Sequence, residues 1–260
     1  MPLRQGPRFA MIALWAAIAC ISACSRGAEQ PVMVATASNF LSVAEALERD
    51  FEGQSDVAVN LVSGSTGQLY TQITHGAPYD IFLAADQRRP EMLEEAGYAQ
   101  EGSRFTYAIG RLALWSRDEV GGPDGVDARL RNGDFRALAI ANPDLAPYGA
   151  AAIEVLEALG LQEALQGQLV RGQNVGQVYA LVATGNAEMG FVALSQMMAQ
   201  GDDLQGDFWE VPSMLYAPIR QDGVLLTGSA DNPAAAAFLA YLGSERARRI
   251  IARSGYGVEE

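Results

Sequence analysis

The chain has 260 residues, of which 18 are basic and 31 are acidic, so its formal net charge at pH 7 is -13. Every basic residue is an arginine. This acidic balance excludes nucleic acid as a partner, because contacts to the phosphate backbone need clustered lysine and arginine.

The N-terminus has the features of an export signal. Arg4 and Arg8 form a basic region, and the apolar run over residues 9–21 is too short to span a membrane comfortably. The run ends in Ile21-Ser22-Ala23-Cys24, which resembles a bacterial lipoprotein box. Residues 1–23 are therefore expected to be a signal peptide.

Cleavage before Cys24 would leave this cysteine as the site of lipidation, with the protein anchored to a membrane in the periplasm or at the cell surface. The alternative is plain signal cleavage near Ala23 or Ala28, which leaves a free thiol. Both cysteines of the chain, Cys20 and Cys24, lie in this segment. The exported domain therefore cannot form an internal disulfide, and it lacks the Cys and His clusters of zinc or iron–sulfur sites.

Loss of Arg4 and Arg8 with the signal changes the net charge by two, from -13 to -15. The remaining length suits two lobes of about 100 residues each. Apolar runs and helical spacing then predict the elements in chain order. In the first half, strands are expected over residues 31–37, 57–62, 80–84 and 105–115, and helices after Ser38, from Ser65 and after Asp86.

A loop is expected over residues 121–125, where the sequence is Gly-Gly-Pro-Asp-Gly. In the second half, strands are expected over residues 137–141, 169–170, 188–193 and 218–226, and helices from Pro147, after Asn174, and over 194–199, 233–241 and 244–254. Alternating strands and helices predict an α/β fold with mainly parallel sheets. The long run over 105–115 can connect two lobes, and the run over 218–226 can return to the first. Lobe 1 is therefore expected to contain residues 31–110 plus 221–260, and lobe 2 residues 111–220.

The turn at Ser65 is the first candidate for a binding site. Ser65 and Gln68 have the spacing of a capping box, which predicts a helix that begins at Ser65. The start of a helix has unpaired N–H groups and a partial positive charge, so it attracts anions. An ordinary capped helix without a ligand remains the alternative for this turn alone.

Four such entries from strand to helix carry small or polar residues. They are Ser38-Asn39, Ser65-Thr66, Tyr148-Gly149 and Asn174-Val175-Gly176. An ordinary cap at Ser38, a favoured N-cap residue, is the alternative for the first entry. Asn174 with Gln177 three residues on resembles a second capping box. In open α/β sheets, ligands bind beyond the carboxyl ends of the strands. Because two entries lie early in the chain and two in the middle, they predict a cleft between lobes. None of them contains an arginine, so backbone N–H groups and hydroxyls would have to hold an anion there.

At these turns the chain resembles the periplasmic molybdate-binding proteins of ABC importers. The segments that carry the resemblance are residues 35–40, 64–70, 76–80, 102–110, 142–149, 174–177 and 190–195. The resemblance covers nearly everything after the signal peptide. It implies a two-lobed, type II periplasmic binding protein with a ligand cleft between the lobes, no catalytic activity and no cofactor. It also implies a monomer that delivers its ligand to a membrane permease and its ATPase.

The resemblance also implies the ligand contacts. Ser38, with Asn39 beside it, and Thr66, with Ser65 adjacent, would supply hydroxyls, while Tyr148 and Val175 would supply backbone N–H groups; these groups would contact the oxygens of molybdate rather than the metal itself. Some members of the family use a tyrosine hydroxyl near the position of Ala193, and alanine cannot supply that bond. A cage of neutral donors suits a fully deprotonated dianion, so molybdate or tungstate ranks first, sulfate second and phosphate third.

Three other classes of function stay open. An enzyme is disfavoured because the sequence has no Gly-x-Ser-x-Gly elbow, Walker loop or metal-ligand cluster. A binding protein for an organic acid would call for an arginine fork, for which Arg104, Arg111 and Arg220 are the nearest candidates. A surface interaction protein without a ligand would have no need for the four polar turns.

Overall fold

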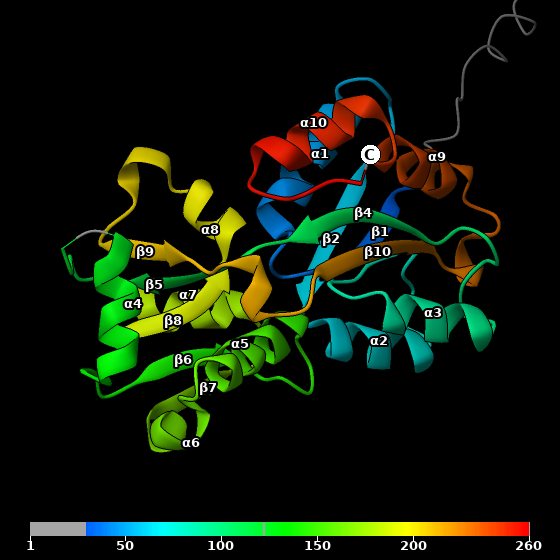
Figure 1. The fold of residues 1–260 in the computed structure, drawn as a ribbon. Coiled ribbons are helices and arrows are strands. Elements are labelled where there is room, and N and C mark those ends of the chain that lie inside the picture. Colours follow the sequence, from blue (N-terminus) through cyan, green and yellow to red (C-terminus); the bar gives the residue numbers. More distant parts are fainter. Residues whose placement is uncertain (1–29, 122, 260) are drawn as a thin grey trace, which may run out of the picture.

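The computed structural model describes residues 30–121 and 123–259. The predicted signal peptide and Cys24 lie outside this part of the chain. Two five-stranded sheets form the cores of two lobes that lie side by side (Figure 1). The first sheet contains β1 (Val32–Ala37), β2 (Val59–Gly64), β3 (Ile81–Leu83), β4 (Phe105–Gly110) and β10 (Ile219–Leu225), in the order β2-β1-β3-β10-β4. The second contains β5 (Leu112–Ser116), β6 (Leu138–Ala141), β7 (Leu169–Gly172), β8 (Met189–Ala193) and β9 (Asp207–Glu210), in the order β7-β6-β8-β5-β9.

Both sheets are mixed rather than mainly parallel, because the strands next to the two passages between the lobes run antiparallel to their neighbours. In the first, β1 pairs in parallel with β2 and β3, whereas β10 runs antiparallel to β3 and β4. In the second, β6 pairs in parallel with β7 and β8, whereas β5 runs antiparallel to β8 and β9. The parallel part of each sheet holds the strands that feed the predicted binding turns.

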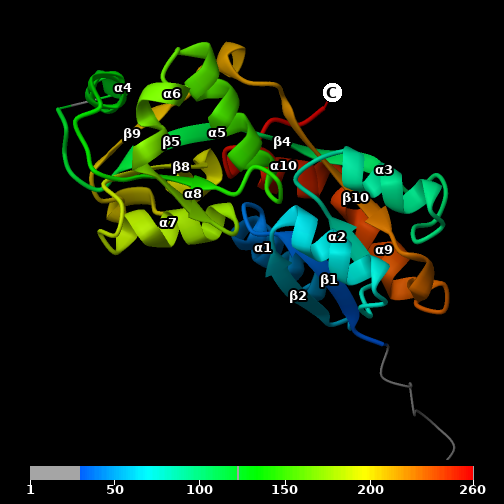
Figure 2. The ribbon, with the colours of Figure 1, turned by 90° about the horizontal axis from the view of Figure 1, so that it is seen from below.

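Helices cover both faces of each sheet, as the view from below shows (Figure 2). In the first lobe they are α1 (Leu41–Glu52), α2 (Thr66–Thr74), α3 (Arg88–Glu95), α9 (Pro233–Leu242) and α10 (Glu245–Arg253). In the second lobe they are α4 (Pro123–Asn132), α5 (Pro147–Ala158), α6 (Gln162–Leu165), α7 (Val175–Ala183) and α8 (Leu194–Met198).

The alternation of side chains along β1 explains the two layers of helices. Val32 and Val34 are buried on one face, in a cluster with residues of α1, α9 and α10. Ala35 points to the other face, in a cluster with Leu69 of α2 and Leu93 of α3. Because successive strand residues face opposite sides, a nearly continuous apolar strand buries both of its faces.

The chain passes between the lobes beside Arg111. The long apolar run over residues 105–115 is divided there, since β4 belongs to the first sheet and β5 to the second. The Arg111 carbonyl accepts a hydrogen bond from the Leu194 backbone N–H and so bonds to lobe 2 rather than to the first sheet. The second passage leads from β9 to β10, which returns to the first sheet as expected.

At three places the structure differs from what the local sequence suggested. Ser38 does not cap a helix, because α1 begins at Leu41 with Phe40 as its N-cap residue. The segment 121–125 is not wholly a loop, because α4 begins at Pro123, and proline is favoured at the first position of a helix. The strand β9 had no clear apolar run in the sequence. None of the helices in the described ranges is both long and apolar enough to cross a bilayer.

Candidate functional site

All six predicted site residues line one small cavity where the two lobes meet. The described lining consists of Ala37, Ser38, Asn39, Gly64, Ser65, Thr66, Ala85, Ala146, Pro147, Tyr148, Asn174 and Val175. The cavity has a volume of about 10 Å³, far below the roughly 300–1,000 Å³ of pockets for drug-sized organic ligands. Its lining contains no charged side chain. Any ligand bound at this site would therefore be held by neutral groups.

Sheet topology brings these residues together. In the first sheet β1 and β2 are adjacent and parallel, so Ala37 and Gly64 lie side by side at their carboxyl ends and lead into the first two turns. In the second sheet β6 and β7 are adjacent and parallel in the same way, with Ala141 beside Gly172. The two pairs of carboxyl ends face the same gap between the lobes, as expected for open α/β sheets.

The start of α2 supplies two buried hydroxyls. Ser65 is the N-cap residue, and its Oγ accepts a hydrogen bond of 3.3 Å from the Gln68 backbone N–H. The Thr66 Oγ1 accepts a hydrogen bond of 3.1 Å from the Ala85 backbone N–H. Because each hydroxyl acts as an acceptor in these bonds, its own proton remains available for a ligand. Both residues are at most 2% exposed.

Ser38 and Asn39 have different roles in the structure. The Ser38 Oγ lies 3.5 Å from the Gly176 backbone nitrogen of the other lobe, which is a long contact for a hydrogen bond. The Asn39 side-chain amide instead donates to Gln221 Oε1 at 2.9 Å and to the Tyr256 hydroxyl at 3.1 Å. Asn39 therefore lines the cavity, but its amide hydrogens serve the protein interior.

Two helix starts of lobe 2 complete the lining. Tyr148 is the second residue of α5, after Pro147, and Val175 is the first residue of α7. At these positions the backbone N–H has no partner within its own helix. The Asn174 Oδ1 caps α7 by accepting from the Gln177 N–H at 3.0 Å.

The close packing of α5 on β6 depends on Gly149. A Cβ atom at this position would lie 2.2 Å from the Ala141 carbonyl oxygen. Only glycine therefore allows the first turn of α5 to sit directly at the end of β6, and this contact fixes the height of the Tyr148 N–H in the cleft.

The cleft is held in a closed arrangement by contacts between the lobes. The Gly67 N–H donates to the Leu145 carbonyl at 2.9 Å, and the Gln68 Nε2 donates to Gln173 Oε1 at 3.1 Å. Arg89, paired with Asp86, donates to the Asp144 carbonyl at 2.8 Å. These groups surround the cavity without entering its lining.

Six described lining residues were not assigned as contacts from the sequence: Ala37, Gly64, Ala85, Ala146, Pro147 and Asn174. Ala85 follows β3, the neighbour of β1, so the rule of strand ends would have found it, although it carries no polar side chain. Asn174 was expected only as a cap. Ala193, where a tyrosine was considered, is outside the lining and is the N-cap residue of α8. Within the described ranges, no group of three or more His, Cys, Asp or Glu residues is arranged to hold a metal ion.

Comparison with known proteins agrees with this geometry. The model of a family described as bacterial extracellular solute-binding protein matches residues 32–257. Molybdate-binding protein ModA of Azotobacter vinelandii is 48% identical over 237 residues, which cover 91% of this chain and 93% of that protein. Molybdate-binding protein ModA of Rhodobacter capsulatus is 45% identical over 230 residues, which cover 88% of each protein.

A solved structure is similar over the same range. The periplasmic molybdate-binding protein of Azotobacter vinelandii matches with a TM-score of 0.84 and 40% identity, covering 88% of this chain and 100% of that one. The predicted two-lobed binding-protein fold and the extracytoplasmic location are thus confirmed, and the family consists of binding proteins rather than enzymes. The chain belongs to the bacterial extracellular solute-binding proteins and, within them, to the group of the ModA proteins.

Proposed function

We propose that this protein captures molybdate, or the closely similar tungstate, outside the cytoplasm and delivers it to the permease and ATPase of an ABC importer. The observation that carries the proposal is the lining of the cavity, which gathers neutral donors from both lobes and contains no charged side chain. The names of the relatives, molybdate-binding proteins at 45% and 48% identity, support the choice of ligand.

The proposed donors are the hydroxyls of Ser38, Ser65 and Thr66 and the backbone N–H groups of Tyr148 and Val175, with Asn39 supporting the first turn. A hydrogen bond to a charged group contributes about 1.5–3 kcal/mol. About five such bonds offset much of the cost of desolvating a dianion and of ordering two lobes. The remainder is compatible with micromolar or tighter binding, which corresponds to about -8 kcal/mol or below.

The donor set also argues for an anion that carries no proton. A protonated oxyanion such as hydrogen phosphate needs an acceptor for its O–H group, and a carboxylate is the usual one. The nearest acidic candidate in the sequence, Asp144, lies in a neighbouring cavity and not in the lining of this one. Molybdate and tungstate fit this lining better than phosphate.

A calorimetric panel of molybdate, tungstate, sulfate and phosphate on the signal-free protein tests the proposal. Strong heats with molybdate and tungstate and none with phosphate are expected. Tight binding of sulfate alone would reassign the protein to sulfate, and no binding of any oxyanion would reject the site.

Three further parts of the proposal concern the whole protein. Lobe 1, residues 31–110 plus 221–260, and lobe 2, residues 111–220, move as two rigid units when the ligand leaves. The protein acts as a monomer. Cys24 carries a lipid that holds it near the importer, and mass spectrometry of the membrane fraction after expression with the native signal tests this, because an unmodified soluble form would contradict it.

A further inference from the structure

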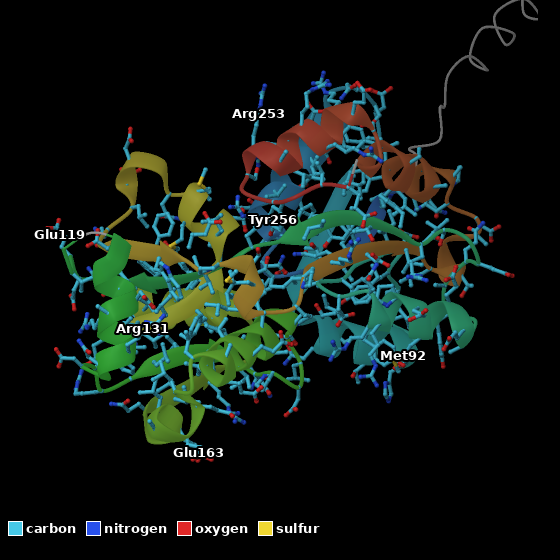
Figure 3. The ribbon with its side chains drawn as sticks, in the orientation of Figure 1. Met92, Glu119, Arg131, Glu163, Arg253 and Tyr256 are labelled. Atoms are coloured by element: carbon cyan, nitrogen blue, oxygen red, sulfur yellow. The ribbon has the colours of Figure 1, made fainter. Side chains whose placement is uncertain are left out.

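A buried set of polar side chains lies behind the cavity, where the lobes join. We call it the hinge network; its members are Asn39, Tyr107, Tyr148, Ser195, Gln221 and Tyr256. Tyr148 and Ser195 belong to lobe 2, and the other four to lobe 1. Tyr256 lies below α10 near the junction of the lobes (Figure 3).

Gln221 is the centre of this network. It is fully buried, and its Oε1 accepts a hydrogen bond from the Asn39 Nδ2 at 2.9 Å. The Tyr107 hydroxyl lies 3.1 Å from the same oxygen and shares its one proton between it and the Ala84 carbonyl at 2.9 Å. Its Nε2 donates to the Tyr148 hydroxyl at 3.3 Å, which crosses from lobe 1 to lobe 2. Glutamine suits this place because its carboxamide both donates and accepts.

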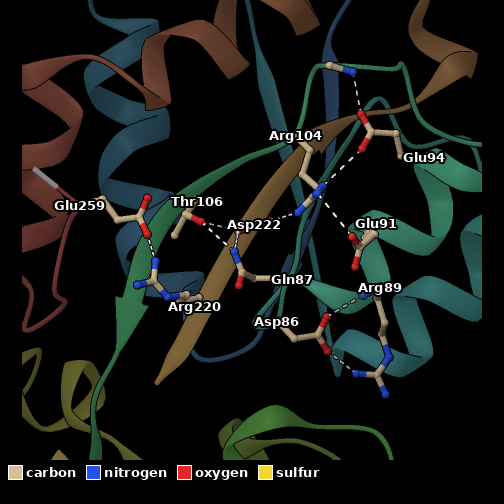
Figure 4. Close-up of polar contacts among 11 residues, drawn as sticks. Asp86, Gln87, Arg89, Glu91, Glu94, Arg104, Thr106, Arg220, Asp222 and Glu259 are labelled. Carbon is tan, nitrogen blue, oxygen red and sulfur yellow. Dashed lines mark hydrogen bonds and ion pairs between the residues drawn. The ribbon is translucent and has the colours of Figure 1, made fainter. Parts of the chain in front are cut away.

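The strand that carries Gln221 is firmly held. The next residue, Asp222, is 1% exposed and accepts hydrogen bonds from Arg104 at 2.9 Å and from Thr106 at 2.7 Å (Figure 4). The hydrogen bond to Asp222 raises the pKa of Arg104 above its ordinary value. Gln221 therefore projects from a part of β10 that is tied to β4 by the side chain of its neighbour, although the pairing of the two strands shifts register between Gln221 and Asp222.

Tyr148 reaches Gln221 only because of a glycine in β4. A Cβ atom at Gly110 would lie 2.3 Å from the Tyr148 hydroxyl and 2.7 Å from the Gln221 Nε2. The side chain of Tyr148 thus passes directly over the strand that leads to the hinge. The same residue contributes the backbone N–H of the first turn of α5 to the proposed oxyanion site.

We propose that Gln221 is a positioning residue for oxyanion binding. It holds the Tyr148 hydroxyl against lobe 1, and it thereby fixes the first turn of α5, with its free N–H, in the closed cleft. Through its other bond it holds Asn39 beside Ser38. Gln221 does not line the cavity, so it acts through these two residues; the inference rests on the function proposed above.

Affinity measurements on folded variants test this role. Gln221→Met keeps the length of the side chain and removes all three bonds, whereas Tyr148→Phe removes only the hydroxyl and leaves the backbone N–H in place. Each should weaken molybdate binding about tenfold, chiefly through faster dissociation, which corresponds to a difference near the value for one hydrogen bond. The double variant should bind no more weakly than the weaker single variant, because the two changes break the same link.

Tyr241→Phe is the matched control. The Tyr241 hydroxyl donates to Asp50 Oδ2 at 2.7 Å within lobe 1, away from the cleft. This variant should lower the unfolding midpoint and leave the affinity unchanged. If Gln221→Met does not fold, the comparison of Tyr148→Phe with Tyr241→Phe decides the question.

The outcomes separate the two proposals. If the wild-type protein binds no oxyanion, both fail. If Gln221→Met and Tyr148→Phe bind molybdate as tightly as the wild-type protein does, the proposed function stands and the positioning role of Gln221 is refuted. Additive losses in the double variant would also refute it, because they would show that the two side chains act separately.

Discussion

Of the three proposed hydroxyl donors, Ser38 is the one least engaged with its own protein. Its side chain is only partly buried, and among the described residues its Oγ has one hydrogen-bond contact, the 3.5 Å approach of the Gly176 nitrogen. Since Gly176 belongs to lobe 2, this hydroxyl sits where both lobes can share a ligand. Because the Ser38 hydroxyl has few hydrogen bonds within the protein, it is available to a ligand. Its removal leaves few protein groups without a hydrogen-bond partner.

Ser38→Ala should therefore weaken oxyanion binding by roughly 1–3 kcal/mol with little loss of stability. Titration calorimetry and thermal unfolding of the same sample check both parts. Ser42→Ala, on the exposed side of α1, is the control and should change neither. Unchanged affinity of Ser38→Ala would remove Ser38 from the site.

The Thr66 hydroxyl accepts a hydrogen bond from the protein and is proposed to donate one to the ligand. Its removal should therefore lower both the stability and the affinity. Thr66→Val keeps the shape but leaves the buried Ala85 N–H without its acceptor, which costs about 1–3 kcal/mol of stability, and it deletes a ligand donor as well. Thr66→Ser keeps the hydroxyl and should bind nearly as well as the wild type. A valine variant with full affinity would show that the hydroxyl serves only Ala85.

At the scale of elements, the helix starts show where patterns in the sequence are reliable. Both predicted N-caps, Ser65 and Asn174, accept from the residue three positions ahead. The reciprocal bonds of the predicted capping boxes are absent, because Gln68 and Gln177 both bond to Gln173 instead. The capping side chain bonds within its own turn, whereas the partner of the longer glutamine side chain depends on the tertiary structure.

The junction between β6 and α5 gives a prediction at this scale. Gly149→Ala should displace the first turn of α5, and with it the Tyr148 N–H, because the new Cβ would lie 2.2 Å from a backbone oxygen. We expect a loss of stability of roughly 1–3 kcal/mol together with weaker binding. Gly167→Ala, where a Cβ would meet nothing within 4 Å, is the control. Equal behaviour of the two variants would contradict the role of this contact.

At the scale of the whole molecule, the contacts across the cleft imply that the ligand stabilises a closed form. Gly67 to Leu145 and Gln68 to Gln173 join the lobes beside the cavity and can break when the lobes separate. Small-angle scattering should therefore show a smaller radius of gyration with molybdate than without it. The same radius in both states would argue against a hinge motion.

The hinge network also predicts a response to alkaline pH. Burial raises the pKa of Tyr256 from its ordinary value of 10 to about 12, and it raises the pKa values of Tyr107 and Tyr148 well above that ordinary value. The folded state thus keeps protons that the unfolded state loses above pH 10. The contribution of these three tyrosines to the free energy of unfolding should be constant below pH 10 and should fall as the pH rises toward 12. Urea unfolding across this range checks it, and a midpoint that does not fall would contradict the burial of these hydroxyls.

The sequence alone determined the local parts of this protein: the alternation of strands and helices, the caps at Ser65 and Asn174, and the helix that begins at Pro147. These features depend on residues within a few positions of each other, and apolar spacing and capping chemistry report them directly. The four polar turns and their family resemblance also named the six residues of the proposed site, as residues of a shared cleft.

Only the tertiary structure decided how those residues are used. It divided the run over 105–115 at Arg111, turned the Asn39 amide toward Gln221, and placed the Tyr148 hydroxyl over Gly110. Asn39 and Gln221 are 182 positions apart in the chain. Their bond depends on the relative placement of β1 and β10 in the first sheet, and no local pattern contains that information.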